Sequence, residues 1–357
     1  MDASDGTVAA EGVTPAELRL AARNHALPLE ALRYDITPVG LHYLLIHYDI
    51  PAVDPAVFTL EVDGAVERPL RLSLADLQAR ERVTMPITFE CAGNGRALLE
   101  PRPISQPWLT EAVGTAEWGG TPLAPLLEEA GVRDGAVEAL LTGLDRGLEG
   151  GRPQSYERSL PLGDTGEALL AYEMNGAPLP PQHGFQLRLV VPGWYGMTNV
   201  KWLARVTLLE QPFEGYQNTV AYRMYDAEGE PGDPVTRMLP RSLMVPPGVP
   251  DFMSRERHLE PGPATLTGRA WSGQGPIERV EVSTDGGATF APAELDEPLG
   301  PAAWRGWRFA WDAQPGENVL CSRATDAAAN TQPLDPPWNL KGYSNNAVER
   351  IAVVVAA

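Results

Sequence analysis

The last third of the chain constrains its fold most strongly, because it contains a series of short segments in which apolar and polar residues alternate. In order, these segments are TLTGRAW, IERVEVSTDGGATF, WRGWRFAW, NVLCSRATD and VERIAVVV. Short strands at regular spacing, separated by turn signals such as Asp285-Gly286, are typical of an antiparallel sandwich. No helical pattern interrupts the series. The sequence therefore predicts an all-β, immunoglobulin-like sandwich.

The rest of the chain mixes strands with helices. A proline-rich stretch, MLPRSLMVPPGVPD, marks a boundary, and 357 residues are more than one core usually supports. We expect two domains, 1–240 and 241–357. Upstream, the expected elements are a helix from Pro15, a hairpin over 56–72 turning at Asp63-Gly64, a helix capped by Ser73 and Asp76, a strand before Cys91, and a helix ending at Gly131. Since strands and helices do not alternate regularly, residues 1–240 are predicted to form an α+β domain.

Charge and composition limit the partners of the chain. It carries 47 acidic and 28 basic residues, for a formal net charge of −19, which argues against nucleic acid and anionic membranes as partners. If the protein binds an anion, its positively charged side chains must therefore be concentrated at the binding site. The N-terminal stretch shows no secretory signal and no segment has the roughly 20 apolar residues of a membrane helix. We expect a cytoplasmic location, unless a targeting segment is missing from the sequence given.

The stretch FECAGNGR carries the clearest chemistry. It places Cys91 on a Gly/Asn-rich turn that ends at Arg96, and a nearby cation or metal favours a thiolate. A thiolate either attacks an electrophile or binds a soft metal, and the stretch alone leaves both open. Cys321 lies within a predicted strand, where a small buried side chain is the simplest role, and two distant cysteines make a disulfide framework improbable. Three tryptophans nearby are predicted core or interface residues: Trp304, Trp307 and Trp311.

Two further groups of polar residues can be read either as a site or as ordinary structure. Arg23, Asn24 and His25 follow the first predicted helix, where a solvated basic helix end is the simpler interpretation. His183, Arg188 and Lys201 lie in or beside a Gly/Pro/Asn-rich loop between two apolar runs. These three suit an anionic ligand, but hydrogen-bonded loop residues are an equally good interpretation.

The motifs in their order closely resemble the sulfite oxidase family of molybdopterin enzymes. They are RNHALP, FECAGNGR, LLAYEMNGAPLPPQHGFQLRLVVPG, VKWL, RAWSG, VSTDGG and WNLKGYSNN. The resemblance implies a molybdopterin-binding domain followed by a dimerisation domain. It also implies molybdenum and molybdopterin (pyranopterin dithiolene) as cofactors, and oxidation of sulfite to sulfate by oxygen-atom transfer.

Residue roles follow from the same resemblance. Cys91 matches the cysteine that ligates molybdenum, which favours the ligand over the nucleophile. The matched substrate-site positions are Arg23, Arg96, Trp108, Tyr222 and Lys341. The matched cofactor-binding positions are Asn24, His25, Asp145, His183, Arg188 and Lys201. Tyr216 and Tyr225 are rivals of Tyr222, and Lys341 stands where the family has an arginine, so it keeps the charge but loses bidentate geometry.

The resemblance also bears on partners. The sequence has no CxxCH motif for covalent haem, so electrons are expected to pass to oxygen or to a separate acceptor, for which the negative charge favours a c-type cytochrome. A homodimer is expected from the C-terminal domain. Three functions stay open: a sulfite-oxidising enzyme; a related molybdenum enzyme acting on a sulfoxide, nitrate or protein-bound sulfane; and a non-catalytic binding protein.

Overall fold

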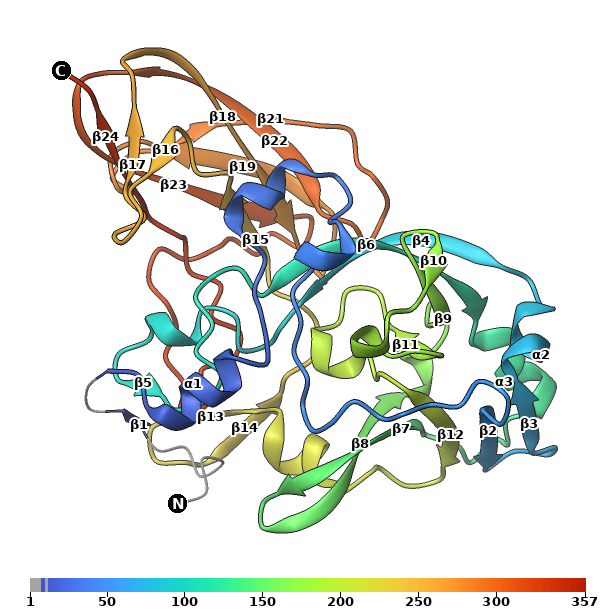
Figure 1. Ribbon diagram of the computed structural model, residues 1–357. Coiled ribbons are helices and arrows are strands. Elements are labelled where there is room, and N and C mark those ends of the chain that lie inside the picture. Colours follow the sequence, from blue (N-terminus) through green and yellow to red (C-terminus); the bar gives the residue numbers. More distant parts are fainter. Residues whose placement is uncertain (1–7, 10–11) are drawn as a thin grey trace.

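The computed structural model describes residues 8–9 and 12–357, and it is mostly β-structure. Figure 1 shows a first domain, coloured blue to yellow, and beside it an orange and red sandwich built from the last third of the chain. Both predicted fold classes are confirmed: a mixed domain with few helices precedes an all-β domain. The exact boundary at 240/241 stays a prediction.

Two five-stranded sheets form the first domain. The first sheet has the order β10-β9-β6-β4, with β11 paired to β9. Its strands are Val83–Glu90 (β4), Val113–Pro122 (β6), Leu169–Met174 (β9), Ala177–Pro178 (β10) and Arg188–Val190 (β11). The second sheet has the order β3-β2-β12-β7-β8, in which only β2 and β12 run parallel. Its strands are Thr59–Gly64 (β2), Leu70–Ser73 (β3), Glu138–Glu149 (β7), Arg152–Pro161 (β8) and Leu203–Leu209 (β12).

The remaining elements of the first domain are short. The pairs β1 (Val8–Ala9) with β5 (Arg102–Pro103), and β13 (Arg223–Tyr225) with β14 (Pro231–Pro234), form two-stranded ribbons. The α-helices are Pro15–Ala21 (α1), Leu74–Gln78 (α2) and Ala124–Ala130 (α3). Short 3₁₀-helices cover Leu29–Arg33, Val39–Leu41, Arg96–Leu98, Leu162–Asp164, Pro181–His183 and Gly196–Thr198, and a single π-helical turn covers Gln217–Ala221.

Local capping explains where the helices begin and end. The Ser73 hydroxyl accepts a hydrogen bond from the Asp76 amide, and the Asp76 carboxylate accepts one from the Ser73 amide, which closes a capping box on α2. Helix α3 ends at Gly131, whose φ of 70° is left-handed. These predicted helix ends are confirmed.

The predicted turn at Asp63-Gly64 is wrong by a few residues. Both residues belong to β2, and the connection to β3 lies at 65–69. Strand β2 continues because Asp63 and Gly64 pair with Thr207 and Leu208 of β12. The Asp63 carboxylate also accepts a hydrogen bond of 2.8 Å from the Thr207 hydroxyl. Tertiary pairing therefore outweighs the local preference of Asp-Gly for a turn.

The C-terminal sandwich has a four-stranded and a six-stranded sheet. The first has the order β15-β18-β22-β21, with strands Arg241–Met244 (β15), Gly262–Trp271 (β18), Glu294–Leu295 (β21) and Arg305–Ala313 (β22). The second has the order β16-β17-β24-β23-β19-β20. Its strands are Val249–Pro250 (β16), Arg257–Leu259 (β17), Ile277–Ser283 (β19), Ala291–Pro292 (β20), Gly316–Asp326 (β23) and Ile351–Val355 (β24).

The core of the molecule is continuous across the two parts. Trp307 and Trp311 are buried between the sheets of the sandwich, and Cys321 is buried in β23 as a free thiol. Trp271 and Trp304 instead pack with Tyr222 and other residues of the first domain in one apolar cluster. The sandwich is thus attached to the first domain by buried aromatic surface.

The segment 338–349 returns from the sandwich to the first domain before the chain enters β24; Figure 1 shows it as the red loop that descends toward β5. The Ser344 amide donates to the Ala92 carbonyl at 2.8 Å, so this segment lies against the turn after β4. None of the described helices is long and apolar enough to cross a membrane.

Candidate active site

The turn that carries Cys91 begins where β4 ends. The Cys91 amide donates to the Ala112 carbonyl on the neighbouring chain segment at 2.9 Å, and the Cys91 carbonyl accepts from the Asn94 amide at 2.9 Å. Gly95 has a φ of 86°, and a Cβ there would lie 2.8 Å from Nδ2 of Asn345. The sequence CAGNG therefore folds tightly here because a glycine is required at residue 95.

The Cys91 thiol is a poor free nucleophile. Its side chain is 9% exposed, and burial raises the pKa of Cys91, with the charge of Arg96 opposing this only in part. A thiol whose ordinary ionisation is disfavoured by burial becomes a thiolate when a metal cation binds it. The environment is that of a metal ligand more than that of an attacking group.

Two cavities meet at Cys91. The first has a volume of about 70 Å³ and is lined by His183, Arg188, Lys201 and Asp145, among others. The second has a volume of about 340 Å³ and is lined by Arg96, Trp108, Lys341 and Tyr343, among others. Four residues line both cavities: Leu45, His47, Cys91 and Tyr222. A group bound to the Cys91 sulfur would thus face both spaces.

The first cavity holds two cations, buried Arg188 and half-buried Lys201, and neither forms a salt bridge among the residues that the structure describes. Arg188 donates to the carbonyls of His183 and Asn199 at 3.0 and 3.1 Å. Lys201 Nζ donates to the carbonyls of Leu45 and Gln182 at 2.8 and 3.0 Å. Burial lowers the pKa of Arg188 to about 10, and burial followed by the Arg188 charge lowers the pKa of Lys201 to about 7. An anion bound here would remove this cost.

Other polar atoms in the same cavity lack hydrogen-bond partners. Among the residues that the structure describes, Nε of Arg188, Oδ1 of Asp145 and Nε2 of His42 are buried without a hydrogen bond. Burial raises the pKa of Asp145 to about 6 and lowers that of His42 to about 4. It lowers the pKa of His183 to about 2, with the neighbouring His42 adding to the effect. Unsatisfied donors and an acceptor beside unpaired cations fit a polar organic anion such as a phosphorylated pterin.

Arg96 and Lys341 are joined on the wall of the second cavity. Arg96 donates from Nε to the Lys341 carbonyl at 2.7 Å, and its guanidinium lies 5.1 Å from the centroid of the Tyr343 ring. Lys341 Nζ donates to the Val220 carbonyl at 2.7 Å. Trp108 is buried on the same wall, beside Cys91.

Tyr222 is the only one of the three candidate tyrosines that lines both cavities. Tyr216 lines the second cavity alone, and the Tyr225 hydroxyl donates to the Val220 carbonyl at 3.0 Å. Burial raises the pKa of Tyr222, with nearby Tyr156 adding to the effect. Its phenol therefore keeps its proton at neutral pH and can donate a hydrogen bond.

The structure does not bring Arg23, Asn24 and His25 into either cavity. Arg23 is exposed and donates to the Tyr48 carbonyl at 2.8 Å, and His25 is exposed. Asn24 is buried, but its amide group bonds the Gln106 side chain and the Ile46 amide. Arg23 and His25 still act on cavity residues: after burial, the charge of Arg23 is among the causes that lower the pKa of Lys201, and His25 is among those that lower the pKa of His183. The sequence-based assignments of Arg23, Asn24 and His25 stay predictions.

The segment His42–Tyr48 lines the cavities instead, and sequence reasoning missed it. It lies beside the segment 23–25, because His25 and Leu44 form an isolated β-bridge. His42 lines the first cavity, and His47 lines both. The available signal was two histidines in a run of aromatic and apolar residues, HYLLIHY.

A carboxylate on the second cavity wall was also missed. Glu149, at the end of β7, accepts from the Tyr48 hydroxyl and from Gln217, both at 2.6 Å, and lies 3.9 Å from Nε2 of His47. Burial alone would raise the pKa of Glu149, but His47 and these donors lower it to about 2. The cavity therefore presents one negative group opposite its cations.

Comparisons with known proteins agree with this geometry. The chain matches the family models described as oxidoreductase molybdopterin binding domain, over residues 47–217, and Mo-co oxidoreductase dimerisation domain, over residues 238–356. It is 36% identical to sulfite oxidase from Gallus gallus, covering 88% of this chain and 72% of that protein. It is 35% identical to mitochondrial sulfite oxidase from Homo sapiens, covering 90% of this chain but only 62% of the human protein's length.

Two further matches lie in related groups. Nitrate reductase [NAD(P)H] from Hordeum vulgare is 32% identical over 96% of this chain and 42% of that protein. The crystal structure of the sulfane dehydrogenase SoxCD from Paracoccus pantotrophus superposes with a TM-score of 0.80 at 28% identity. That match covers 93% of this chain and 86% of that one.

Proposed function

The chain belongs to the sulfite oxidase family of molybdopterin-dependent oxidoreductases, and on this premise we propose that it oxidises sulfite to sulfate. It is an enzyme that uses molybdenum and molybdopterin, so a purely non-catalytic role is not retained. The meeting of two cavities at Cys91 carries the proposal: one has the groups for an anionic cofactor, and the other has cations for a small anion.

In this proposal, Cys91 is the protein's ligand to molybdenum, and the first cavity holds the pterin. Arg188 and Lys201, with His183 beside them, would bind its phosphate, because their charges have no carboxylate hydrogen-bond partner in the contacts described above. The unpartnered atoms of Asp145 and His42 would bind the polar edge of the ring system. When bound, the molybdenum supplies two-electron oxidation with oxygen-atom transfer.

Residues of the second cavity would bind and orient sulfite. The guanidinium of Arg96 and the ammonium of Lys341 supply positive charge on one wall, held in place by backbone carbonyls. The protonated phenol of Tyr222 faces the same space and can donate to a sulfite oxygen. The buried indole of Trp108 limits access of water to the region of Cys91. Arg23, whose side chain is exposed in this structure, would add a further cation at the edge of the site, because its charge already acts on Lys201.

A second candidate substrate is a larger sulfur compound or another oxyanion. The second cavity, at about 340 Å³, is larger than sulfite alone requires, and Glu149 lowers its positive charge. One structural relative is a sulfane dehydrogenase and another relative is a nitrate reductase. Lys341 also recognises an oxyanion less specifically than an arginine fork would.

We propose that electrons leave to a separate acceptor such as a c-type cytochrome, and that the chain is a homodimer through residues 238–356. The net charge of −19 supports steering of a basic partner. A cytochrome-linked rate that does not change with ionic strength would contradict steering.

The deciding experiment combines metal analysis with reduction of the purified protein. We expect about one molybdenum per chain, and sulfite added without air should bleach the absorption of the oxidised metal-thiolate centre. Nitrate (after reduction with dithionite) and thiosulfate serve as parallel substrates. Bleaching by thiosulfate but not by sulfite would replace sulfite with a sulfane substrate, and no reaction with any of them would refute the proposal.

A further inference from the structure

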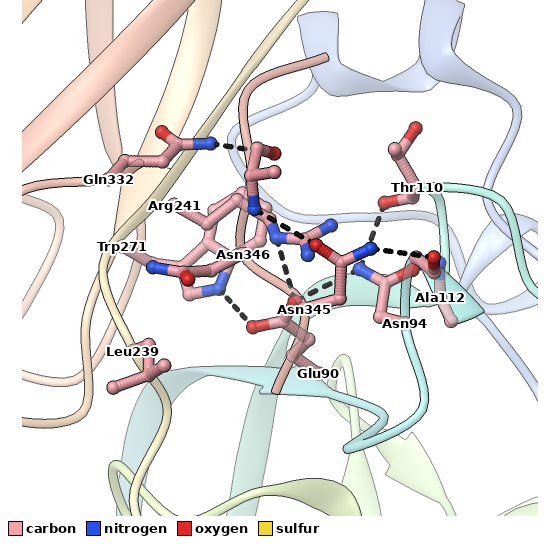
Figure 2. Close-up of polar contacts among 12 residues, drawn as sticks. Glu90, Asn94, Thr110, Ala112, Leu239, Arg241, Trp271, Gln332, Asn345 and Asn346 are labelled. Atoms are coloured by element: carbon pink, nitrogen blue, oxygen red, sulfur yellow. Dashed lines mark hydrogen bonds and ion pairs between the residues drawn. The ribbon is translucent and has the colours of Figure 1, made fainter. Parts of the chain in front are cut away.

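The residue before Cys91 is a buried carboxylate with three partners. Glu90 is 2% exposed. Its Oε1 accepts from Asn94 Nδ2 at 3.0 Å and lies 3.1 Å from Nε of Arg241. Its Oε2 accepts from the indole Nε1 of Trp271 at 2.9 Å. Figure 2 shows these three groups converging on the one carboxylate.

Two of those partners come from the C-terminal sandwich. Arg241 opens β15 and Trp271 closes β18, and the two residues are directly paired across these neighbouring antiparallel strands. Paired residues on adjacent strands project from the same face of a sheet. Arg241 is only 1% exposed, so the sheet presents a fixed, dry cation and an indole N–H to Glu90.

From Glu90 the contacts continue into the turn that carries Cys91. Asn94 uses the rest of its amide group on the backbone: Nδ2 donates to the Thr110 carbonyl at 2.9 Å, and Oδ1 accepts from the Ala112 amide at 3.0 Å. The Ala112 carbonyl in turn accepts from the Cys91 amide. Glu90 therefore fixes Asn94, and Asn94 fixes the backbone on both sides of Cys91.

The returning segment of the sandwich holds the same turn from outside. The Ser344 amide donates to the Ala92 carbonyl at 2.8 Å, and Asn345 Nδ2 donates to the Gly95 carbonyl at 2.7 Å. Asn346 Nδ2 donates to the Pro240 carbonyl at 2.9 Å, which ties this segment to the start of β15. Two carbonyls of the turn, those of Ala92 and Gly95, are thus bonded by the returning segment.

Charge gives Arg241 a second effect. The guanidinium of Arg241 compensates the charge of Glu90 at 3.1 Å. Loss of this cation would leave Glu90 buried without its counter-charge, and breaking one member of a buried pair costs far more than replacing both. The contacts through which Glu90 holds Asn94 and the turn would then loosen.

We propose that Arg241 and Trp271, acting through Glu90, are positioning residues for the Cys91 sulfur. The domain that is described in the family as a dimerisation domain would then also complete the metal site of its own chain. This inference rests on the proposed role of Cys91 as the molybdenum ligand.

The test compares four variants of the full chain: Arg241→Met, Glu90→Gln, their double, and Trp271→Phe, which keeps the aromatic packing and removes the N–H. In the holoenzyme, the measured quantities are molybdenum per chain, the position of the thiolate-to-metal absorption band, and the electron paramagnetic resonance g-values of the half-reduced centre. In cofactor-free protein that also carries Cys321→Ser, the rate of Cys91 modification by a thiol reagent is measured.

We expect Arg241→Met and Glu90→Gln to shift the band and the g-values, and to speed thiol modification by about tenfold or more. The double variant should be nearer the wild type in thermal stability than either single variant. Trp271→Phe should show the same spectroscopic shift, but smaller.

A matched control is Arg257→Met. Arg257 is also a buried arginine of the sandwich, 3% exposed, and it pairs across the domains with Glu30 at 3.1 Å, away from Cys91. We expect Arg257→Met to lower the thermal stability and to leave the absorption band and the g-values unchanged. If Arg241→Met and Trp271→Phe also leave the band, the g-values and the thiol rate unchanged, the inference is wrong. If Cys91→Ser retains the band, the ligand assignment itself fails, which is a separate outcome.

Discussion

Replacing Lys201 with methionine should stabilise the cofactor-free protein at low pH and weaken the cofactor-bound form. The chain has only two lysines, Lys201 and Lys341. In the folded protein without an anion, the pKa of Lys201 falls from 10.5 to about 7, mainly through burial. Between these two values the unfolded chain binds more protons than the folded one, so this group makes stability rise with pH. Its destabilising effect is complete below about pH 7 and is lost as pH approaches 10.5.

The magnitude follows from the size of this change. Each pKa unit corresponds to about 1.4 kcal/mol, which sets an upper limit of about 5 kcal/mol. Because the ammonium is partly exposed and donates to two carbonyls, we expect about 2 to 4 kcal/mol. Methionine leaves those carbonyls without their donor, at a cost of about 1 to 2 kcal/mol. The net gain for Lys201→Met at pH 6 is therefore about 1 to 2 kcal/mol, and it should reverse to a loss near pH 9.5.

The assay is urea unfolding of cofactor-free protein, wild type and variant, at pH 6 and pH 9.5. Lys341→Met, which removes the other lysine from the wall of the second cavity, is the control and should show no such crossing. In the holoenzyme a bound phosphate restores the charged state of Lys201, so Lys201→Met should lower the molybdenum content of the purified protein. If Lys201→Met changed the free energy of unfolding by the same amount at both pH values, one idea would be refuted: that the folded protein keeps this cation at a cost in stability in order to bind an anion.

Three further outcomes test the cavities. Cys91→Ser should abolish the metal-thiolate absorption and reduce sulfite turnover by about 100-fold or more, with the fold retained by circular dichroism; near-normal turnover would contradict the ligand assignment. Lys341→Arg should lower the KM for sulfite severalfold, because a guanidinium can bind two oxygens, and an unchanged KM would mean that residue 341 does not face the anion. Glu149→Gln should lower the KM by roughly threefold to tenfold at pH 7, since the low pKa keeps this carboxylate charged. Glu157→Gln, in the middle of the β7–β8 pair opposite Thr142, is the control. Equal KM values in both variants would mean that Glu149 does not affect sulfite binding.

The sequence predicted the structure correctly where the conformation depends on only a few neighbouring residues. The capping box of Ser73 and Asp76, the left-handed Gly131 and the alternating strands of the sandwich each depend on short-range geometry. The turn at Cys91 belongs to the same class, because its glycines and Asn94 close it within a few residues. In these places propensity and tertiary structure agree.

The residues that line the cavities could not be predicted from short motifs, because contacts between distant parts of the chain place them there. The match of Arg23 to a substrate residue rests on the motif RNHALP and stays a prediction, and in this structure its side chain donates to the Tyr48 carbonyl. His47 reaches both cavities because the β-bridge of His25 with Leu44 sets the path of the following segment. Glu149 reaches the second cavity only because β7 is 12 residues long and extends past the sheet. Each placement follows from the length or pairing of an element more than from residue type.

The sequence composition divides the chain into two domains, but in the structure these two domains share buried surface. Trp271 and Trp304 of the sandwich are buried against Leu27 and Tyr222 of the first domain, and Arg241 is buried against Glu90. A sandwich without the first domain would expose two indoles and leave a buried arginine without its carboxylate, which are costs that an independently folding domain avoids. The same contacts explain why the turn at Cys91 can be tight without its own hydrophobic support: Ser344 and Asn345 supply the partners that its backbone lacks. The turn that carries Cys91 is therefore better understood as a feature of the interface than of the first domain alone.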